Sequence, residues 1–260
     1  MRDVLAYTFF ALKDYKKSFS IVFLLTIFSY LERLPFISLI LFIFEKILLF
    51  SIGSLIIYLL SKSKNYEHFY KNIKLQPIST LFFHFLPTAM GAVFGLMILM
   101  FSITGLLYFV LSLFTVPFVF DMNIIFTYLD SSIFLSLMLL FYSFYILLVI
   151  YVLFGKVSLS LNSHNFKGAF LAIISSLVDY KYFLRTNIKY FSLFIFYFFV
   201  AVFYYIISTF IFNWIIYKDL FVSPFNIMDI FLIFFISFFT LFNIYLFFIS
   251  SYFANRETVK

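Results

Sequence analysis

In this chain of 260 residues, 65% of residues are hydrophobic and only 11% carry a charge. Soluble domains carry roughly 25% charged residues, and long uncharged apolar runs are typical of transmembrane segments. A single soluble core could not bury so many apolar runs. The chain contains no cysteine, which excludes disulfides, thiolate catalysis, zinc–thiolate sites and iron–sulfur clusters. The formal charge of +7 predicts contact with anionic headgroups at basic cytoplasmic loops rather than with nucleic acid, because no soluble basic domain is predicted.

Segment 1–17 is predicted to be an amphipathic helix on the membrane surface. Its apolar residues recur near helical spacing, at Val4, Phe9, Leu12 and Tyr15. The lysines of this segment, Lys13, Lys16 and Lys17, are expected to face water or headgroups. Charged residues interrupt the segment and no small-residue cleavage site follows, so we expect it to be retained rather than removed as a secretory leader. A first span is predicted over 18–31, short at 14 residues.

The second predicted span, 36–60, is the best bounded. Eighteen of its 25 residues are Leu, Ile or Phe, and together these contribute roughly −8 kcal/mol to insertion. Glu45 and Lys46 lie well inside the span and oppose insertion by roughly +6 kcal/mol at full depth. The apolar residues outweigh the two charges, so the segment is expected to insert. Segment 61–77 follows as a polar, basic loop.

Glu45 and Lys46 form a candidate intramembrane polar site, because charges within a membrane suggest a proton or substrate pathway. Adjacent residues point about 100° apart on a helix, so we do not expect the two side chains to pair with each other. Each is expected to face another span, or Lys46 to extend toward water. The alternative is a packing or snorkelling role, or a shallower span.

Segment 78–120 carries no formal charge. We interpret 81–87 as an entry segment and 88–115 as one tilted span. Two spans with a turn near 102–105 are the alternative, which would place no charge at the turn and would disturb the charge alternation described below. Gly91 and Gly95 in this span form a small-xxx-small face and are candidates for close helix packing.

The remaining spans are predicted over 131–154, 190–217 and 227–253. The polar stretch 155–189 contains a second surface helix, indicated by apolar residues at Phe166, Phe170, Ile173, Ile174 and Leu177. Trp214 and Tyr217 are expected at the membrane interface, and Asp229 is expected to cap the last helix. The predicted fold is a single all-α domain over 1–260, a polytopic transmembrane helix bundle of six spans in three hairpins with two cytoplasmic-face amphipathic helices.

The positions of the basic residues predict the orientation. Segments 1–17, 61–77, 155–189 and 254–260 fall on one face and hold 15 of the 18 lysines and arginines. This bias predicts that both termini lie in the cytoplasm. A composition rich in Phe, Ile, Lys, Tyr and Asn suggests an AT-rich genome, and we expect a bacterial inner membrane. A short internal similarity relates LKDYKK at 12–17 to LVDYKY at 177–182.

Four short motifs carry a resemblance to known families: the surface helix 1–17, the span end 53–60 with its polar loop, LPxxxG at 86–91, and NFKGAF at 165–170. With them, the chain resembles a family of six-span prokaryotic integral membrane proteins of unknown function. It is also similar to the membrane domain of some glycerophosphodiester phosphodiesterases. Neither resemblance implies catalytic residues here, because the first family has no established activity. The chemistry of the second resides in a separate soluble domain.

The sequence contains no phosphate-binding glycine loop, G-x-S-x-G or H-E-x-x-H motif. His68, His84 and His164 lack metal-ligand spacing, so no cofactor or metal is predicted. We therefore expect a non-enzymatic multi-pass protein that acts through helix packing and lipid or partner contacts, including a possible homo-oligomer. The alternative is a small permease or transport component that uses Glu45 and Lys46. A third hypothesis, a lipid-modifying enzyme, would need a cytoplasmic cleft built from Glu67, His68, His164 and Asp179.

Overall fold

The computed structural model describes residues 1–31, 37–77, 84–112, 133–163, 165–179, 188–219 and 227–255. Within these ranges the chain forms nine α-helices and one 3₁₀ turn, with no strand. The predicted all-helical fold is confirmed. Five described segments are long and apolar enough to cross a membrane, which is compatible with a multi-pass membrane protein: Ser38–Lys62, Leu86–Leu106, Leu139–Leu161, Ile188–Ile211 and Asp229–Ala254.

Six long helices make up most of the bundle: α2 (Tyr15–Leu31), α3 (Ser38–Lys62), α6 (Leu86–Ser112), α8 (Ile133–Leu161), α11 (Ile188–Asp219) and α12 (Ile227–Ala254). Three short helices lie between or before them: α1 (Arg2–Leu12), α4 (Tyr66–Leu75) and α9 (Phe166–Ile174), which continues into the 3₁₀ turn Ser175–Leu177. Uninterrupted apolar runs favour helices because a helix satisfies its own backbone hydrogen bonds away from water.

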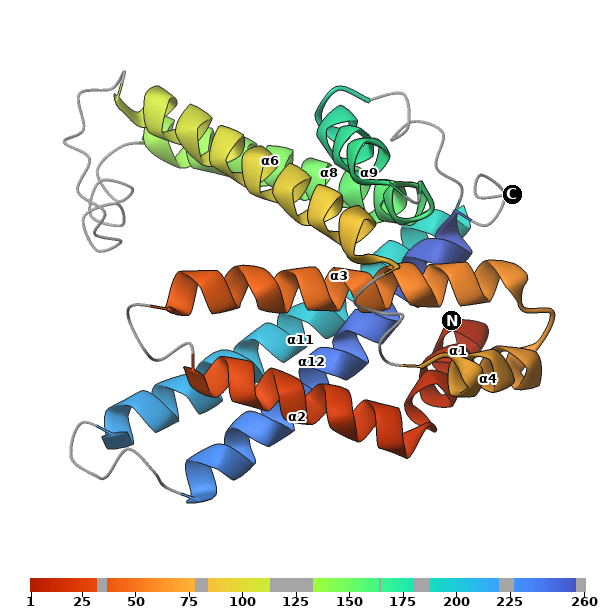
Figure 1. Ribbon diagram of the computed structural model, residues 1–260. Helices are drawn as coiled ribbons and strands as arrows, with labels where there is room; N and C mark the ends of the chain where they lie inside the picture. Colours follow the sequence, from red (N-terminus) through yellow and green to blue (C-terminus); the bar gives the residue numbers. More distant parts are fainter. Residues whose placement is uncertain are drawn as a thin grey trace.

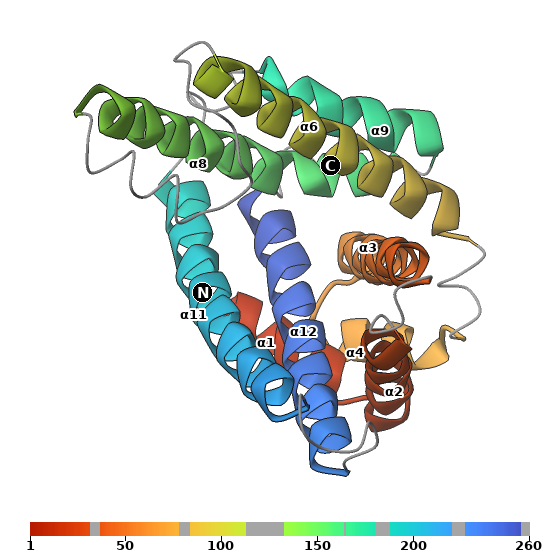
Figure 2. The ribbon, with the colours of Figure 1, turned by 90° about the vertical axis from the view of Figure 1, so that its left-hand side faces the viewer.

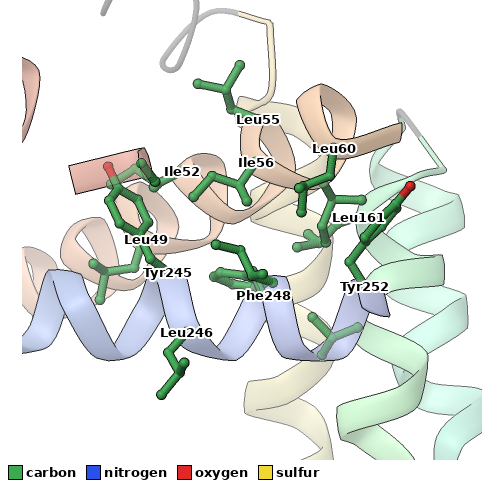
Figure 3. Close-up of a cluster of buried hydrophobic side chains, with 14 of the residues drawn as sticks. Leu49, Ile52, Leu55, Ile56, Leu60, Leu161, Tyr245, Leu246, Phe248 and Tyr252 are labelled. Atoms are coloured by element: carbon green, nitrogen blue, oxygen red, sulfur yellow. The ribbon is translucent and has the colours of Figure 1, made fainter. Parts of the chain in front are cut away.

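The last helix, α12, is the centre of the packing and contacts α1, α2, α3, α8 and α11. Its contact with α3 is close because Gly53 has no side chain: an added Cβ would lie 2.3 Å from the ring of Phe248. Figure 3 shows Phe248 pointing from α12 toward α3, next to Ile56. Glu45 and Lys46, the only charged residues in the middle of a described long helix, lie where the buried half of α3 begins, about two turns before Gly53.

The long helices alternate in direction, so their ends gather at two opposite ends of the bundle (Figures 1 and 2). At one end lie α1, α4 and α9 with the last turns of α3, α8 and α12. We call this the basic end, because α4, α9 and the adjacent turns carry many lysines and α1 carries Arg2. The last turns of α2, α6 and α11 lie at the opposite end.

The N-terminal segment differs from its prediction. One helix was expected over 1–17, but α1 ends at Leu12 and α2 begins at Tyr15. Lys17 was expected to face water, whereas its Nζ donates to the carbonyl oxygens of Ile73 and, at 3.0 Å, of Lys74. A lysine placed at the last carbonyls of a helix satisfies acceptors that the helix leaves unpaired. Lys17 therefore closes the C-terminal end of α4 and joins it to α2.

Helix α4 was not predicted, since 61–77 was interpreted as a polar loop. Asn65 begins the helix by accepting a hydrogen bond from the His68 backbone N–H at 2.8 Å. Phe69 and Ile73, four residues apart, supply its buried face. The polar composition of 61–77 suggested a loop, although the sequence does contain an N-cap residue and an apolar i, i+4 pair.

Helix α6 continues through 102–105 as one helix, so the alternative of two spans with a turn there is wrong. The second surface helix is present as α9, but it packs along α6 and α8, with Ala169 and Ile173 fully buried. The predicted turn at 32–35, residues 81–83 of the entry segment 81–87 and the loop 116–130 lie outside the described residues.

Candidate functional site

Glu45 and Lys46 pair with each other, contrary to prediction. The Lys46 Nζ lies 3.0 Å from Glu45 Oε2, and the same ammonium lies 4.7 Å from the centroid of the Phe42 ring. A separation of 100° does not prevent pairing, because the long lysine stem can bend around the helix toward its neighbour. Glu45 is 7% exposed, whereas the Lys46 side chain is 37% exposed.

All of these contacts of Lys46 come from α3 itself. A carboxylate and an ammonium that pair within one helix form a neutral unit, and this lowers the cost of placing them in lipid. The ring of Phe42 adds a cation–π contact to the same unit. The geometry therefore explains how α3 can carry two opposite charges that neutralise each other within one helix.

Gly91 and Gly95 lie at the contact between α6 and α9. A Cβ added to Gly91 would lie 2.3 Å from the backbone oxygen of Phe166, and one added to Gly95 would lie 3.0 Å from Ile173 Cβ. The small residues thus allow α9 to approach the backbone of α6. A contact with a short helix, rather than with another long helix, was not anticipated.

Seven polar side chains of α12 lie on one side of the helix, with apolar residues such as Ile236 and Phe247 between them. At 3.6 residues per turn these side chains fall within roughly 140° of arc: Asp229, Ser237, Thr240, Asn243, Ser250, Ser251 and Asn255. Ser251 Oγ donates to the Phe154 carbonyl at 2.5 Å and lies 2.7 Å from Ser158 Oγ, which joins α12 to α8. The Tyr204 hydroxyl lies 2.6 Å from Thr240 Oγ1, which joins α12 to α11.

The polar face was missed because serines and threonines were treated as scattered. The spacing of Thr240, Asn243, Ser250 and Ser251, at i, i+3, i+10 and i+11, was a signal that could have found it. Buried oxygens of Ser237, Asn243 and Ser250 have no hydrogen-bond partner among the described residues. The hydrogen bonds of Ser251 to α8 and of Thr240 to α11 fix which face of α12 meets each of these neighbours.

A groove of about 1040 Å³ lies between α1, α2 and α12, and we call it the aromatic groove. Seven phenylalanines dominate its walls: Phe9, Phe10, Phe19, Phe234, Phe238, Phe239 and Phe242. Leu12, Lys13, Tyr15, Lys16, Ser18 and Val22 complete the lining, all from the corner where α1 meets α2. Neither this groove nor two smaller cavities lined by described residues includes Glu45.

The other candidate residues do not form a site. Glu67 and His68 lie exposed on α4, on the opposite side of α3 from α9, and Asp179 binds Lys156 with a 2.7 Å contact. His164 lies outside the described residues. Asp229 lies within the first helical turn of α12, near the helix start where it was expected, and is buried. No group of three potential metal ligands occurs among the residues that the structure describes.

No family model, curated protein or solved structure matches this chain. The resemblance to six-span prokaryotic membrane proteins therefore stays a prediction. Functional conclusions depend on the geometry of this chain alone.

Proposed function

We propose that this chain is a six-span integral membrane protein without enzymatic activity, which acts through helix packing and through lipid or partner contacts at its basic end. In this proposal α2–α3, α6–α8 and α11–α12 are three membrane hairpins. Each follows a short helix at the basic end, namely α1, α4 and α9. The basic end lies on the cytoplasmic side of a bacterial inner membrane.

One observation carries this proposal. Apart from Lys46, every lysine or arginine whose side chain is described belongs to α1, α4 or α9, to their adjacent links, or to the turns of α2, α3, α8 and α11 at the basic end. Basic residues remain preferentially in the cytoplasm when hairpins insert. Helix α2, with 17 residues, is at the lower limit of the range of about 17–25 residues that can span a bilayer.

The character of the long helices supports a packing protein over an enzyme or a permease. The charged pair on α3 is closed upon itself, with Glu45 buried. A transport pathway would require a polar cavity that reaches Glu45, whereas a packing role would leave this residue sealed. The burial of Glu45 favours the second description.

Because the chain has no cysteine, single-cysteine labelling tests the orientation directly. Lys64→Cys and Asn123→Cys should respond in opposite ways to a membrane-impermeant thiol reagent added to intact cells. We expect only Asn123→Cys to react before permeabilisation and both to react after it. Labelling of Lys64→Cys in intact cells would contradict the proposed orientation.

Flux tests the absence of transport. If Glu45 and Lys46 line a pathway, the double substitution to leucine should abolish flux while the protein still inserts. We expect reconstituted protein to produce no flux above empty vesicles. Turnover or flux of a co-purifying small molecule, lost in the double variant, would establish the permease alternative.

A further inference from the structure

The aromatic groove combines an apolar wall with a basic mouth. Its volume of about 1040 Å³ is at the upper end of the range of about 300–1,000 Å³ that holds small ligands. Two pairs of rings contact each other between helices in its walls. The ring centroids of Phe9 in α1 and Phe242 in α12 lie 6.2 Å apart, and those of Phe19 in α2 and Phe234 in α12 lie 5.8 Å apart. A surface of this kind is suited to a hydrocarbon chain.

The charges of the groove all lie at one corner. Lys13 and Lys16 are exposed where α1 ends and α2 begins, and the described residues that line the groove include no acidic one. The Lys13 ammonium lies 5.6 Å and 5.5 Å from the ring centroids of Phe10 and Tyr70, which orient it. The neighbouring Asp14 carboxylate lies 3.6 Å from the Lys17 ammonium, and neither residue lines the groove.

We propose that the aromatic groove binds one phospholipid with an anionic headgroup. The phosphate lies between Lys13 and Lys16, next to the first turn of α2, whose N-terminal end favours negative charge. An acyl chain lies against the phenylalanines of α12 and α2. This inference depends on the proposed function in one respect, that the basic end lies at a membrane surface.

Charge complementarity and the shape of the corner select this occupant. The helix breaks between Leu12 and Tyr15, so α1 and α2 meet at an angle. Lys13 and Lys16 lie at this corner, beside the groove. A soluble apolar ligand would not need the lysines, and an apolar partner helix would leave the two exposed ammonium groups without a partner of opposite charge. A phospholipid pairs its phosphate with the lysines and its acyl chain with the phenylalanine wall.

Fluorescence quenching by brominated lipid tests the proposal. Trp214 is the only tryptophan, so Trp214→Phe provides a silent background and Phe238→Trp adds a reporter in the wall of the groove. The protein is placed in phosphatidylcholine bilayers that contain increasing fractions of brominated phosphatidylglycerol or brominated phosphatidylcholine. We expect half-maximal quenching at about a thirtyfold lower fraction of the phosphatidylglycerol, as two lysines near a membrane surface predict.

Two controls separate a site from general contact with lipid. A reporter at Phe203→Trp, exposed on α11 away from the groove, should be quenched equally by both lipids. In the Phe238→Trp protein, Lys13→Gln with Lys16→Gln should remove the preference for phosphatidylglycerol. Lys62→Gln with Lys64→Gln, at the same end of the bundle, should keep it.

Equal quenching by the two lipids at Phe238→Trp would overturn the proposal, and so would a preference that survives loss of Lys13 and Lys16. Single-cysteine labelling reads the orientation independently. Correct labelling without lipid preference therefore rejects the lipid site alone. Inverted labelling rejects the proposed function, whatever the lipid result.

Discussion

Substitution of Gly91 by alanine should separate α9 from α6. The added Cβ would lie 2.3 Å from the backbone oxygen of Phe166, whereas ordinary contacts between heavy atoms begin at about 3.5 Å. The clashing atom belongs to the backbone, so no side-chain rotation can relieve the contact. The two helices must move apart by about 1 Å.

Two opposing effects set the size of the change. Overpacking at a close contact costs about 1–3 kcal/mol, and the upper half of that range applies because the neighbour is backbone. Alanine in place of glycine favours the helix by about 1 kcal/mol. The net loss of stability is therefore about 1–2 kcal/mol, with the opening concentrated at α9.

Helix α6 contains its own matched control. Nothing lies within 4 Å of a Cβ added to Gly105, so Gly105→Ala should keep the helix benefit without a clash. The apparent melting temperatures of the two variants in detergent should differ by at least about 4 °C. Hydrogen exchange should be faster in segment 165–174 of Gly91→Ala only, and Gly95→Ala should give an intermediate result.

Equal stability of Gly91→Ala and Gly105→Ala would refute the reasoning. Faster exchange spread evenly over α6 would refute it as well, because the clash is local to α9. The comparison isolates packing, since both substitutions make the same chemical change in one helix.

Three further predictions concern polar contacts. Lys46→Leu should lower stability, because it leaves Glu45 buried without its partner. The double change Glu45→Leu with Lys46→Leu should be neutral or stabilising. A double variant less stable than Lys46→Leu in detergent melting would contradict the pairing of the two side chains. Ser158→Ala and Ser251→Ala should show a coupling of about 0.6 kcal/mol in a double-mutant cycle, and strictly additive losses would mean that the 2.7 Å contact contributes nothing. The hydrogen bond from the Tyr66 hydroxyl to the Asp3 carboxylate raises the pKa of Tyr66 above its ordinary value, so the bond is complete below the unfolded pKa of 10.0 and is lost as pH rises through the raised value. The stability advantage of the wild type over Tyr66→Phe should therefore shrink only in alkaline melts; an advantage lost near neutral pH would assign it to other groups.

Helix positions were the most predictable part of this fold. The uncharged apolar run before Pro117 predicted one helix through Ser102 and Gly105, and α6 is continuous there. Helix ends were less predictable. The predicted helix over 131–154 continues as far as Leu161, because Lys156 pairs with Asp179 and does not end the helix.

Contacts between side chains were largely unpredictable. Glu45 and Lys46 were recognised as unusual from sequence, but their pairing depends on lysine rotamers that a helical wheel does not represent. Gly91 and Gly95 were recognised as a close-packing face, but their partner, α9, lies more than 70 residues away along the chain. The aromatic groove could not be foreseen, since its walls come from α1, α2 and α12 at opposite ends of the sequence.

By itself, the sequence determined that this protein is helical and apolar enough for a membrane, because length and hydrophobicity are properties of single segments. Only the tertiary structure decided that α12 lies at the centre, that the charges of α3 close on each other and that two lysines stand beside a phenylalanine groove. Those features depend on which helix faces meet. In a chain where nearly every face is apolar, hydrophobicity cannot distinguish one face from another, so glycine contacts and buried hydroxyls make that choice.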